Sequence, residues 1–366
     1  MPAIDHHDTP YDEGTIAKLE LFEKYAEAWL PTFVMSGVRE ICIFDFFAGT
    51  GYDNNQVPGS AIRLLDRIKY YEKIIIERKT KIQVFLNEYK RDKFTVLQEA
   101  VNKYIEDNPQ LKSFVEIDFY NEDFGILFEK LYTRIQKFPS LVYLDQNGIK
   151  YLADKYLLAL EKTKKTDFLY FVSSSYFLRF GERPEFRVNL DLDIEYLKKN
   201  PYKAIHRSLI EQLKNKLPDD TKLRLYPFSI KKGSNIHGII FGATHIRAVD
   251  KFLTISWARN SLNGEADYDI DDDGIKEQLD LFEGKRLTKI ESFNENIRDK
   301  ILKGIIKNNR QAYDFCLSQG HLGRHGAEVI REMKKEKLVD YDSRSPMVTY
   351  ENVYDKRKII MYKVLK

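Results

Sequence analysis

A turn rich in small residues follows the first short apolar run of the chain. Residues 41–51 read ICIFDFFAGTG, so Asp45 ends a strand-like run and Gly49 and Gly51 form the turn after it. At the carboxyl end of a buried parallel strand, such a turn lets the backbone approach a ligand closely. Asn54 replaces the third glycine of a dinucleotide fingerprint, which argues against a nicotinamide or flavin enzyme. A plain tight turn is the alternative interpretation.

Two more acidic residues follow strand-like runs. Glu88 lies just past the run at 81–86, and Asp118 ends the run at 113–118. A carboxylate in the first position can accept hydrogen bonds from both hydroxyls of a ribose, and one in the second from an adenine amino group. With the glycine turn and Phe47 inside it, these acids form a candidate site for a nucleoside cofactor. Ordinary carboxylates at strand ends in solvent are the alternative.

The run at 140–145 ends in a polar turn, Asp145-Gln146-Asn147-Gly148. The carboxylate of Asp145 and the amide of Asn147 could hold an exocyclic amine and orient its lone pair, so that catalysis would come from positioning. These two are therefore the candidate catalytic residues. A Gln-Asn-Gly sequence is also typical of a generic turn.

Apolar runs alternate with amphipathic stretches from residue 38 to about residue 260. This alternation predicts right-handed βαβ crossovers, a buried parallel sheet and, at its end, an antiparallel hairpin. The expected α/β fold resembles the methyltransferase-type (Rossmann-like), mostly parallel seven-stranded sheet. The predicted strands are 41–46, 81–86, 113–118, 140–145, 167–173, 222–230 and 236–245, and the predicted helices are 15–33 (ended by Pro31), 60–76, 90–106, 123–137 and 150–162.

The C-terminal part of the chain differs in charge from the rest. Residues 285–366 contain 19 Lys and Arg against 11 Asp and Glu, a net charge of +8, whereas residues 1–284 carry −5. A basic domain on a mildly acidic body points to an anionic partner such as nucleic acid. The turn-rich acidic stretch 263–284 is a plausible linker between the two.

Three short helices and a hairpin are expected in this basic part. Helices at 294–307, 312–318 and 325–337, followed by strands at 348–354 and 358–364, predict a winged helix. Basic residues on or near its third helix would contact phosphates, although a solvated charged face is the alternative. These candidates are Arg324, Arg331, Lys334 and Lys335, and the expected domains are 1–37 (helical segment), 38–262 (α/β domain), 263–284 (linker) and 285–366 (winged-helix-like domain).

Composition excludes several other classes. The chain has only two cysteines, so it carries no disulfide framework and no cysteine-rich zinc site. The acidic residues at 269–280 match most of a calcium-binding loop, but Asp280 and Lys276 depart from it, and His321 and His325 fit a turn before a helix, so no metal is expected. The polar start and the lack of a long apolar run predict a cytoplasmic protein without a membrane span.

Several segments together resemble the family of three-Cys-motif partner proteins (TcmP). They are KLELFEKYAEAWLP, IFDFFAGTG, PGSAI, FLNEYKRDKF, VYLDQNG and ISWARN with GEADYDID, and they cover nearly the whole chain. The family is similar to S-adenosylmethionine-dependent methyltransferases and its C-terminal part to a winged helix-turn-helix. The three cysteines of its name belong to a genetically linked partner protein.

The resemblance implies S-adenosylmethionine as cofactor, with Asp45, Gly49, Gly51, Glu88 and Asp118 as contacts. The expected activity is methyl transfer to a base of RNA or DNA. Relatives read Asp-Pro-Phe-Gly where this chain has Gln146 and Asn147 in the middle positions. The alternative is therefore a catalytically degenerate methyltransferase fold that senses a nucleotide or binds nucleic acid or a partner, for example in phage defence.

Overall fold

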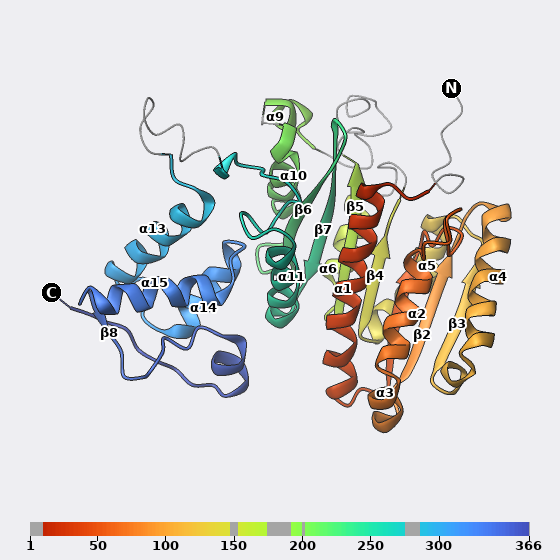
Figure 1. Ribbon diagram of the computed structural model, residues 1–366, viewed down its shortest axis with the longest axis horizontal. Coiled ribbons are helices and arrows are strands. Elements are labelled where there is room, and N and C mark those ends of the chain that lie inside the picture. Colours follow the sequence, from red (N-terminus) through yellow and green to blue (C-terminus); the bar gives the residue numbers. More distant parts are fainter. Residues whose placement is uncertain (1–9, 147–152, 174–191, 200–201, 275–285, 366) are drawn as a thin grey trace. The chain divides into compact units, whose positions relative to one another are not determined.

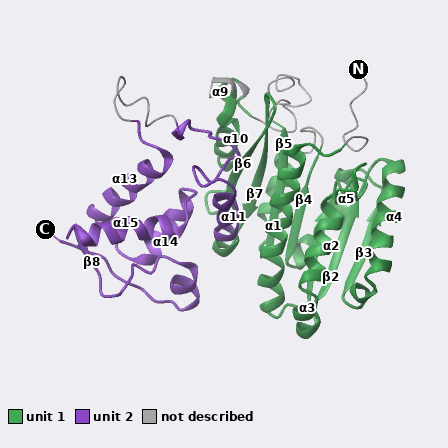
Figure 2. Ribbon diagram, in the orientation of Figure 1, with its two compact units in different colours: residues 1–248 green, residues 249–366 purple. Residues whose placement is uncertain are grey.

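The computed structural model describes residues 10–146, 153–173, 192–199, 202–274 and 286–365 (Figure 1). Contacts within the chain divide it into two compact units, residues 1–248 and 249–366 (Figure 2). The expected boundary lay 14 residues later, at 262, and we describe each unit separately. Within the described ranges, no helix is both long and apolar enough to cross a membrane.

The first unit is built on a seven-stranded sheet with the order β3-β2-β1-β4-β5-β7-β6. The first five strands pair in parallel, while β7 pairs antiparallel with both β5 and β6. This order confirms the predicted methyltransferase-type sheet. The strands are β1 (Glu40–Asp45), β2 (Lys81–Asn87), β3 (Val115–Tyr120), β4 (Ser140–Leu144), β5 (Thr166–Ser173), β6 (Arg224–Lys232) and β7 (Asn235–Ala243).

Helices cover both faces of this sheet. Strand β4 is buried throughout and β1 at all but its first residue, which is why these strands are continuous apolar runs. One face packs against α5, α6 and α10, and the other against α1 and α2. The helices are α1 (Glu13–Met35), α2 (Ser60–Tyr70), α3 (Glu72–Arg78), α4 (Arg91–Asp107), α5 (Phe124–Lys137), α6 (Asp154–Glu161), α9 (Ile194–Lys199) and α10 (Ile205–Lys214).

Helix α1 does not end at Pro31, contrary to the sequence-based expectation. It continues to Met35 and contains Pro31 in its last turns. A proline removes one backbone donor, and the buried residues on either side, Leu30 and Val34, keep the helix packed on the unit. Across the sheet face, the ring of Phe22 stacks on Tyr143 of β4 with their centroids 4.2 Å apart.

The second unit contains the three helices expected of a winged helix. Its elements are α11 (Ile246–Arg259, which begins at the unit boundary), α13 (Lys289–Leu302), α14 (Asn309–Ser318), α15 (Gly323–Lys335), β8 (Val339–Asp340) and β9 (Lys363–Val364). The capping box formed by Thr288 and Glu291 begins α13.

The predicted strand at 348–354 is wrong. Residues Glu351–Asp355 form a π-helical turn, and β9 pairs with β8 and not with this segment. Val348 and Val353 are the buried residues here. Their spacing of five residues does not fit a strand, because an alternating strand would have buried every second residue. A separate, isolated bridge pairs Asn308, directly before α14, with Met361, two residues before β9.

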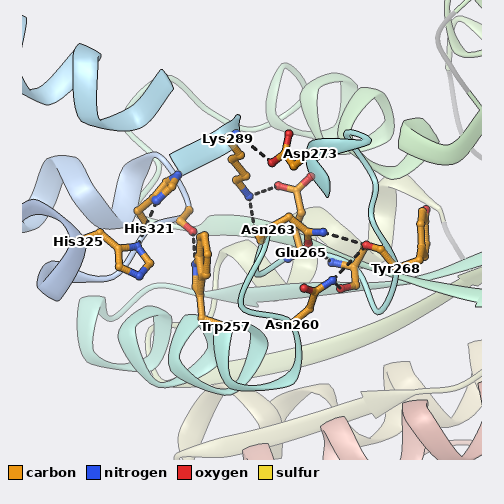
Figure 3. A network of polar contacts seen from close by, with 11 residues as sticks. Trp257, Asn260, Asn263, Glu265, Tyr268, Asp273, Lys289, His321 and His325 are labelled. Carbon is orange, nitrogen blue, oxygen red and sulfur yellow. Dashed lines mark hydrogen bonds and ion pairs between the residues drawn. The ribbon is translucent and has the colours of Figure 1, made fainter. Parts of the chain in front are cut away.

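The described part of the expected linker is folded into the second unit (Figure 3). The ammonium group of Lys289 donates to Glu265 Oε2 at 2.6 Å and to the carbonyl of Asn263 at 2.5 Å. Ala266 and Ile270 are buried. The acidic segment up to residue 274 is therefore a packed loop held by polar contacts, and its remainder lies outside the described residues.

Candidate functional site

Asp45 lies at the carboxyl end of the central strand β1 and is 1% exposed. Its carboxylate accepts hydrogen bonds from Ser60 Oγ at 2.5 Å and from the backbone N–H of Phe47 at 3.2 Å. Burial raises the pKa of Asp45 to about 7, against these bonds, and the charges of Asp145 and Glu88 raise it further. A buried carboxyl group that feels the charges of two other acids favours a cationic neighbour.

The glycine turn and Glu88 meet at the same edge of the sheet. Gly49 and Gly51 have φ of 66° and 84°, in the left-handed region that favours glycine. Burial raises the pKa of Glu88, opposed by hydrogen bonds from the backbone N–H groups of Lys90 and Gly49. The structure thus brings the predicted turn and the predicted ribose acceptor together, although 36 residues separate Gly51 from Asn87 at the end of β2.

Asn87, which the sequence did not single out, joins three strand ends. Its amide Nδ2 donates to the carbonyls of Phe46 and Glu122 at 3.0 and 3.1 Å, and its Oδ1 accepts from the N–H of Glu122 at 3.1 Å. The carbonyl of Asn87 accepts from the N–H of Ala48 at 2.9 Å. In the sequence, the one sign of this role was a polar residue between the apolar run at 81–86 and Glu88.

We expect Asn87→Ala to destabilise the protein by about 2–4 kcal/mol, because one buried and two partly buried backbone groups lose their partners. The glycine turn loses one of its attachments, so the affinity for an S-adenosyl compound should fall as well. Chemical denaturation and calorimetry on the same preparations measure the two effects. Unchanged stability would contradict the positioning role of this amide.

Asp118 lies further from the edge than expected. Strand β3 continues to Tyr120, so Asp118 is two residues before its end, exposed, and opposite Phe85 in the sheet. The carbonyl of Tyr120 accepts from the N–H of Glu88 at 3.2 Å. The strand starts late because residues Pro109–Ser113 form a 3-10 helix. The contact of Asp118 with adenine stays a prediction.

Asp145, directly after β4, forms an ion pair that the sequence did not predict. Lys18 Nζ of α1 lies 2.5 Å from Asp145 Oδ2, with the two side chains 11% and 17% exposed. The same ammonium group lies 4.3 Å from the ring centroid of Phe171 in β5. Asn147, the second candidate catalytic residue, lies outside the described residues. The two elements that meet here are far apart in sequence, which is why periodicity alone could not pair them.

His237 of β7 completes the surroundings of Asp145. Its ring stacks on Phe171, with centroids 5.6 Å apart and planes 13° apart. Burial lowers the pKa of His237 to about 4, and the nearby charges of Lys232 and Lys18 lower it further, against the acids Asp12 and Asp145. The ring is therefore neutral at pH 7. This end of the sheet thus combines a neutral imidazole, an aromatic face and an ion pair.

The candidate phosphate contacts of the second unit fall into two groups. Arg324, Arg331 and Lys335 are exposed on α15. Lys334 instead bonds within the unit: its ammonium lies 2.8 Å from Asp340 Oδ1 and donates to the carbonyl of Tyr341 at 2.6 Å. Three of the four predicted residues are thus exposed on one helix, where Arg324 Nε also donates to His325 Nε2 at 3.5 Å, and Lys334 stabilises the connection after the helix.

The histidines of this unit form a buried pair (Figure 3). The Nδ1 atoms of His321 and His325 lie 3.2 Å apart, and the ring of Phe293 stacks on His321 at 4.0 Å. Burial lowers the pKa of both, to about 2 and about 4, and Lys289 and Arg324 add positive charge nearby. Such surroundings disfavour a metal cation. Where the chain is described, no three His, Cys, Asp or Glu residues gather as a metal site.

The residues at the sheet edge fit an S-adenosyl cofactor in chemical character. Glu88 offers carboxylate oxygens beside the backbone of Gly49, and a cationic sulfonium nearby would favour the ionised form of Asp45. The first unit is thus a methyltransferase-type α/β domain in class, and the second is a winged-helix domain.

One comparison with known proteins agrees with the class of the second unit. A family model described as a GMT-like wHTH domain matches residues 267–346. No curated protein matches the chain. Among solved structures, the chain is similar to one titled a fibrillarin/Nop5p complex, at 13% identity and a TM-score of 0.30, covering 60% of this chain and 82% of that one. It is also similar to DszA carbon methyltransferase, at 13% identity and a TM-score of 0.34, covering 63% and 57%. Both likenesses are distant, and the class follows from the strand order.

Proposed function

We propose that this protein is an S-adenosylmethionine-dependent methyltransferase that acts on a base of RNA or DNA. The observation that carries the proposal is the meeting of Gly49, Glu88 and Asp45 at the carboxyl edge of a methyltransferase-type sheet. Ligands of open α/β sheets bind at this edge. The resemblance of the chain to three-Cys-motif partner proteins adds a second protein as partner.

Each residue at the edge has a role in this proposal. Glu88 accepts hydrogen bonds from the ribose hydroxyls, and the turn at Gly49 and Gly51 lets backbone groups approach the cofactor. The cofactor supplies an electrophilic methyl group. The positive charge of the cofactor would favour the ionised form of Asp45, and Asp145 holds the acceptor amine and orients its lone pair. Phe47, in the same turn, is a further contact candidate.

The acceptor role of Asp145 is tested by Asp145→Asn. We expect the variant to bind S-adenosylhomocysteine as the wild type does, but to transfer no labelled methyl group from S-adenosylmethionine to bulk RNA or DNA. The amide keeps the size of the carboxylate and removes its charge. Asp220→Asn, a change of the same kind on an exposed residue in the turn before β6, is the matched control. Transfer by Asp145→Asn at the wild-type rate would disprove the role.

The second unit would hold the nucleic acid through the exposed cations of α15. We expect the triple replacement of Arg324, Arg331 and Lys335 by Ala to weaken binding to RNA or DNA. The slope of the logarithm of the binding constant against the logarithm of the salt concentration should fall by the equivalent of about 2–3 phosphate contacts. Lys334→Ala is the control, because that ammonium is already bonded to Asp340. Fluorescence anisotropy at several salt concentrations measures both. An unchanged salt slope in the triple variant would show that α15 does not contact the nucleic acid.

One observation favours a second candidate function, a degenerate methyltransferase fold that binds a nucleotide, nucleic acid or partner without catalysis. The carboxylate of Asp145 is already bonded to Lys18 at 2.5 Å, so an acceptor must displace that ammonium group. Cofactor binding without methylation of any nucleic acid would favour this candidate. Such a module could serve in phage defence.

A further inference from the structure

The ammonium group of Lys18 lies where the proposed methyltransferase would hold its acceptor. It is 2.5 Å from Asp145, the carboxylate at the end of β4, and 4.3 Å from the ring centroid of Phe171. A carboxylate to bind the N–H groups and an aromatic face beside them are the features that an amine acceptor needs. The side chain of Lys18 is thus bound as a substrate amine would be.

This placement is unusual for a lysine. Lys18 is 9% exposed as a whole residue, and lysines are seldom so buried unless they are paired. Breaking such a buried pair by removing one partner is costly. The segment just before α1 is also tied to this edge of the sheet, because the N–H of Tyr11 donates to Asp53 Oδ2 at 2.8 Å, between the glycine turn and α2. The position of Lys18 is therefore fixed by the ion pair of its ammonium group and by the attachment of the segment before its helix.

We propose that Lys18 is a methyl acceptor of this protein's own site, so that the protein methylates itself when no other acceptor is bound. The proposal rests on the proposed methyltransferase function and deepens it by naming an acceptor. A protein amine is a different class of acceptor from a base, and it needs no partner to reach Asp145.

The transfer would need only the ammonium group of Lys18, the carboxylate of Asp145 and the methyl group of S-adenosylmethionine. The Lys18 ammonium passes one proton to the Asp145 carboxylate within their hydrogen bond. The lone pair of the resulting amine forms a bond to the methyl carbon, the carbon–sulfur bond breaks, and its electron pair stays on sulfur as a thioether. Asp145 then releases its proton to water. The product is a methylammonium that keeps two N–H donors, so it can pair with Asp145 again.

Two other ion-paired lysines of the same unit serve as internal comparisons. Lys232 lies 2.5 Å from Asp12, the same separation as in the Lys18 pair, but on β6 at the edge of the sheet and with more exposure. Lys24 lies on α1 itself, 3.2 Å from Glu27, and its side chain is 60% exposed. Neither has the end of β4 as its partner.

The test is mass spectrometry of the full-length protein incubated with S-adenosylmethionine alone. We expect the mass of one methyl group to be gained, and peptide mapping to place it on Lys18 about tenfold more often than on Lys232 or Lys24, because only Lys18 is positioned for transfer. Lys18→Arg should gain nothing, and neither should Asp145→Asn. Calorimetry with S-adenosylhomocysteine on each variant shows whether the cofactor still binds.

A second measurement tests the placement without the cofactor. Acetylation by acetyl-N-hydroxysuccinimide should modify Lys18 more slowly than Lys232 in the wild type, and faster in Asp145→Asn than in the wild type. If S-adenosylhomocysteine binds but Lys18 stays unmethylated, the inference is wrong while the proposed function stands. Equal methylation of the three lysines also overturns it. If neither S-adenosyl compound binds, both the proposed function and the inference fall.

Discussion

Glu88→Gln is expected to weaken the binding of S-adenosylmethionine about 10- to 100-fold. The carboxylate of Glu88 lies beside the backbone of Gly49, where a ribose would present two hydroxyl donors. A carboxylate accepts both bonds as an anion, whereas an amide has one acceptor oxygen and an NH2 group that only donates. Hydrogen bonds to charged groups contribute about 1.5–3 kcal/mol. The loss of one such bond therefore corresponds to a rise in the dissociation constant of about 10- to 100-fold.

Calorimetric titration measures this loss, and the controls separate it from unfolding. Glu99→Gln is the same kind of change on an exposed residue of α4 that has no role in the site. We expect this control to bind S-adenosylmethionine with the wild-type dissociation constant. Melting temperatures of both variants should match the wild type within a few degrees. Equal affinity of Glu88→Gln and the wild type would mean that Glu88 does not touch the ribose.

The second unit is expected to lose stability as the pH falls below 6.5. His321 and His325 share a hydrogen bond between their Nδ1 atoms, in which one ring must accept. Protonation turns both Nδ1 atoms into donors and adds charge beside Lys289 and Arg324. The pKa values of about 2 and 4 lie below the value of 6.5 that histidine has in an unfolded chain.

The direction of this pH dependence follows from proton binding in the folded and unfolded states. Below pH 6.5 the two histidines bind protons in the unfolded state but not in the folded state. Their contribution to the free energy of unfolding is therefore complete above pH 6.5 and declines as the pH falls from 6.5 toward 4. At pH 5 the two histidines together account for a loss on the order of 4 kcal/mol. This exceeds the effect of most single substitutions.

Trp257 reports on this pair directly. Its ring lies 5.1 Å from His321 and 4.5 Å from His325, and the chain has only one other tryptophan, Trp29. In a Trp29→Phe background, denaturation followed by Trp257 fluorescence should move to lower denaturant between pH 7.5 and 5. His325→Gln, which cannot take up a proton, should flatten that dependence. An equal shift with and without His325 would refute the assignment.

The sequence predicted what depends on local pattern. The fully apolar runs at β1 and β4 indicated strands covered on both faces, and the glycine turn with Glu88 was recognised because both follow such runs. Each of these features can be recognised from a few neighbouring residues. The same reasoning found the three helices of the second unit.

What the sequence did not predict depends on contacts between distant segments. Lys18 reads as one polar position on an amphipathic helix, and nothing within α1 indicates that Asp145 is its partner. Asn87 likewise acts through the carbonyls of residues 41 and 35 positions away. The stretch 348–354 was misread because its valines and tyrosines favour strands, while burial selected a helical turn.

Calorimetric titration of the full-length wild-type protein with S-adenosylhomocysteine tests the central claim most directly. We expect saturable one-to-one binding that raises the melting temperature, and we expect Gly51→Val to abolish it, because Gly51 has a positive φ and a Cβ there would lie 3.0 Å from Ala100. Absence of binding by the wild type at millimolar ligand would contradict the account of the first unit as a methyltransferase.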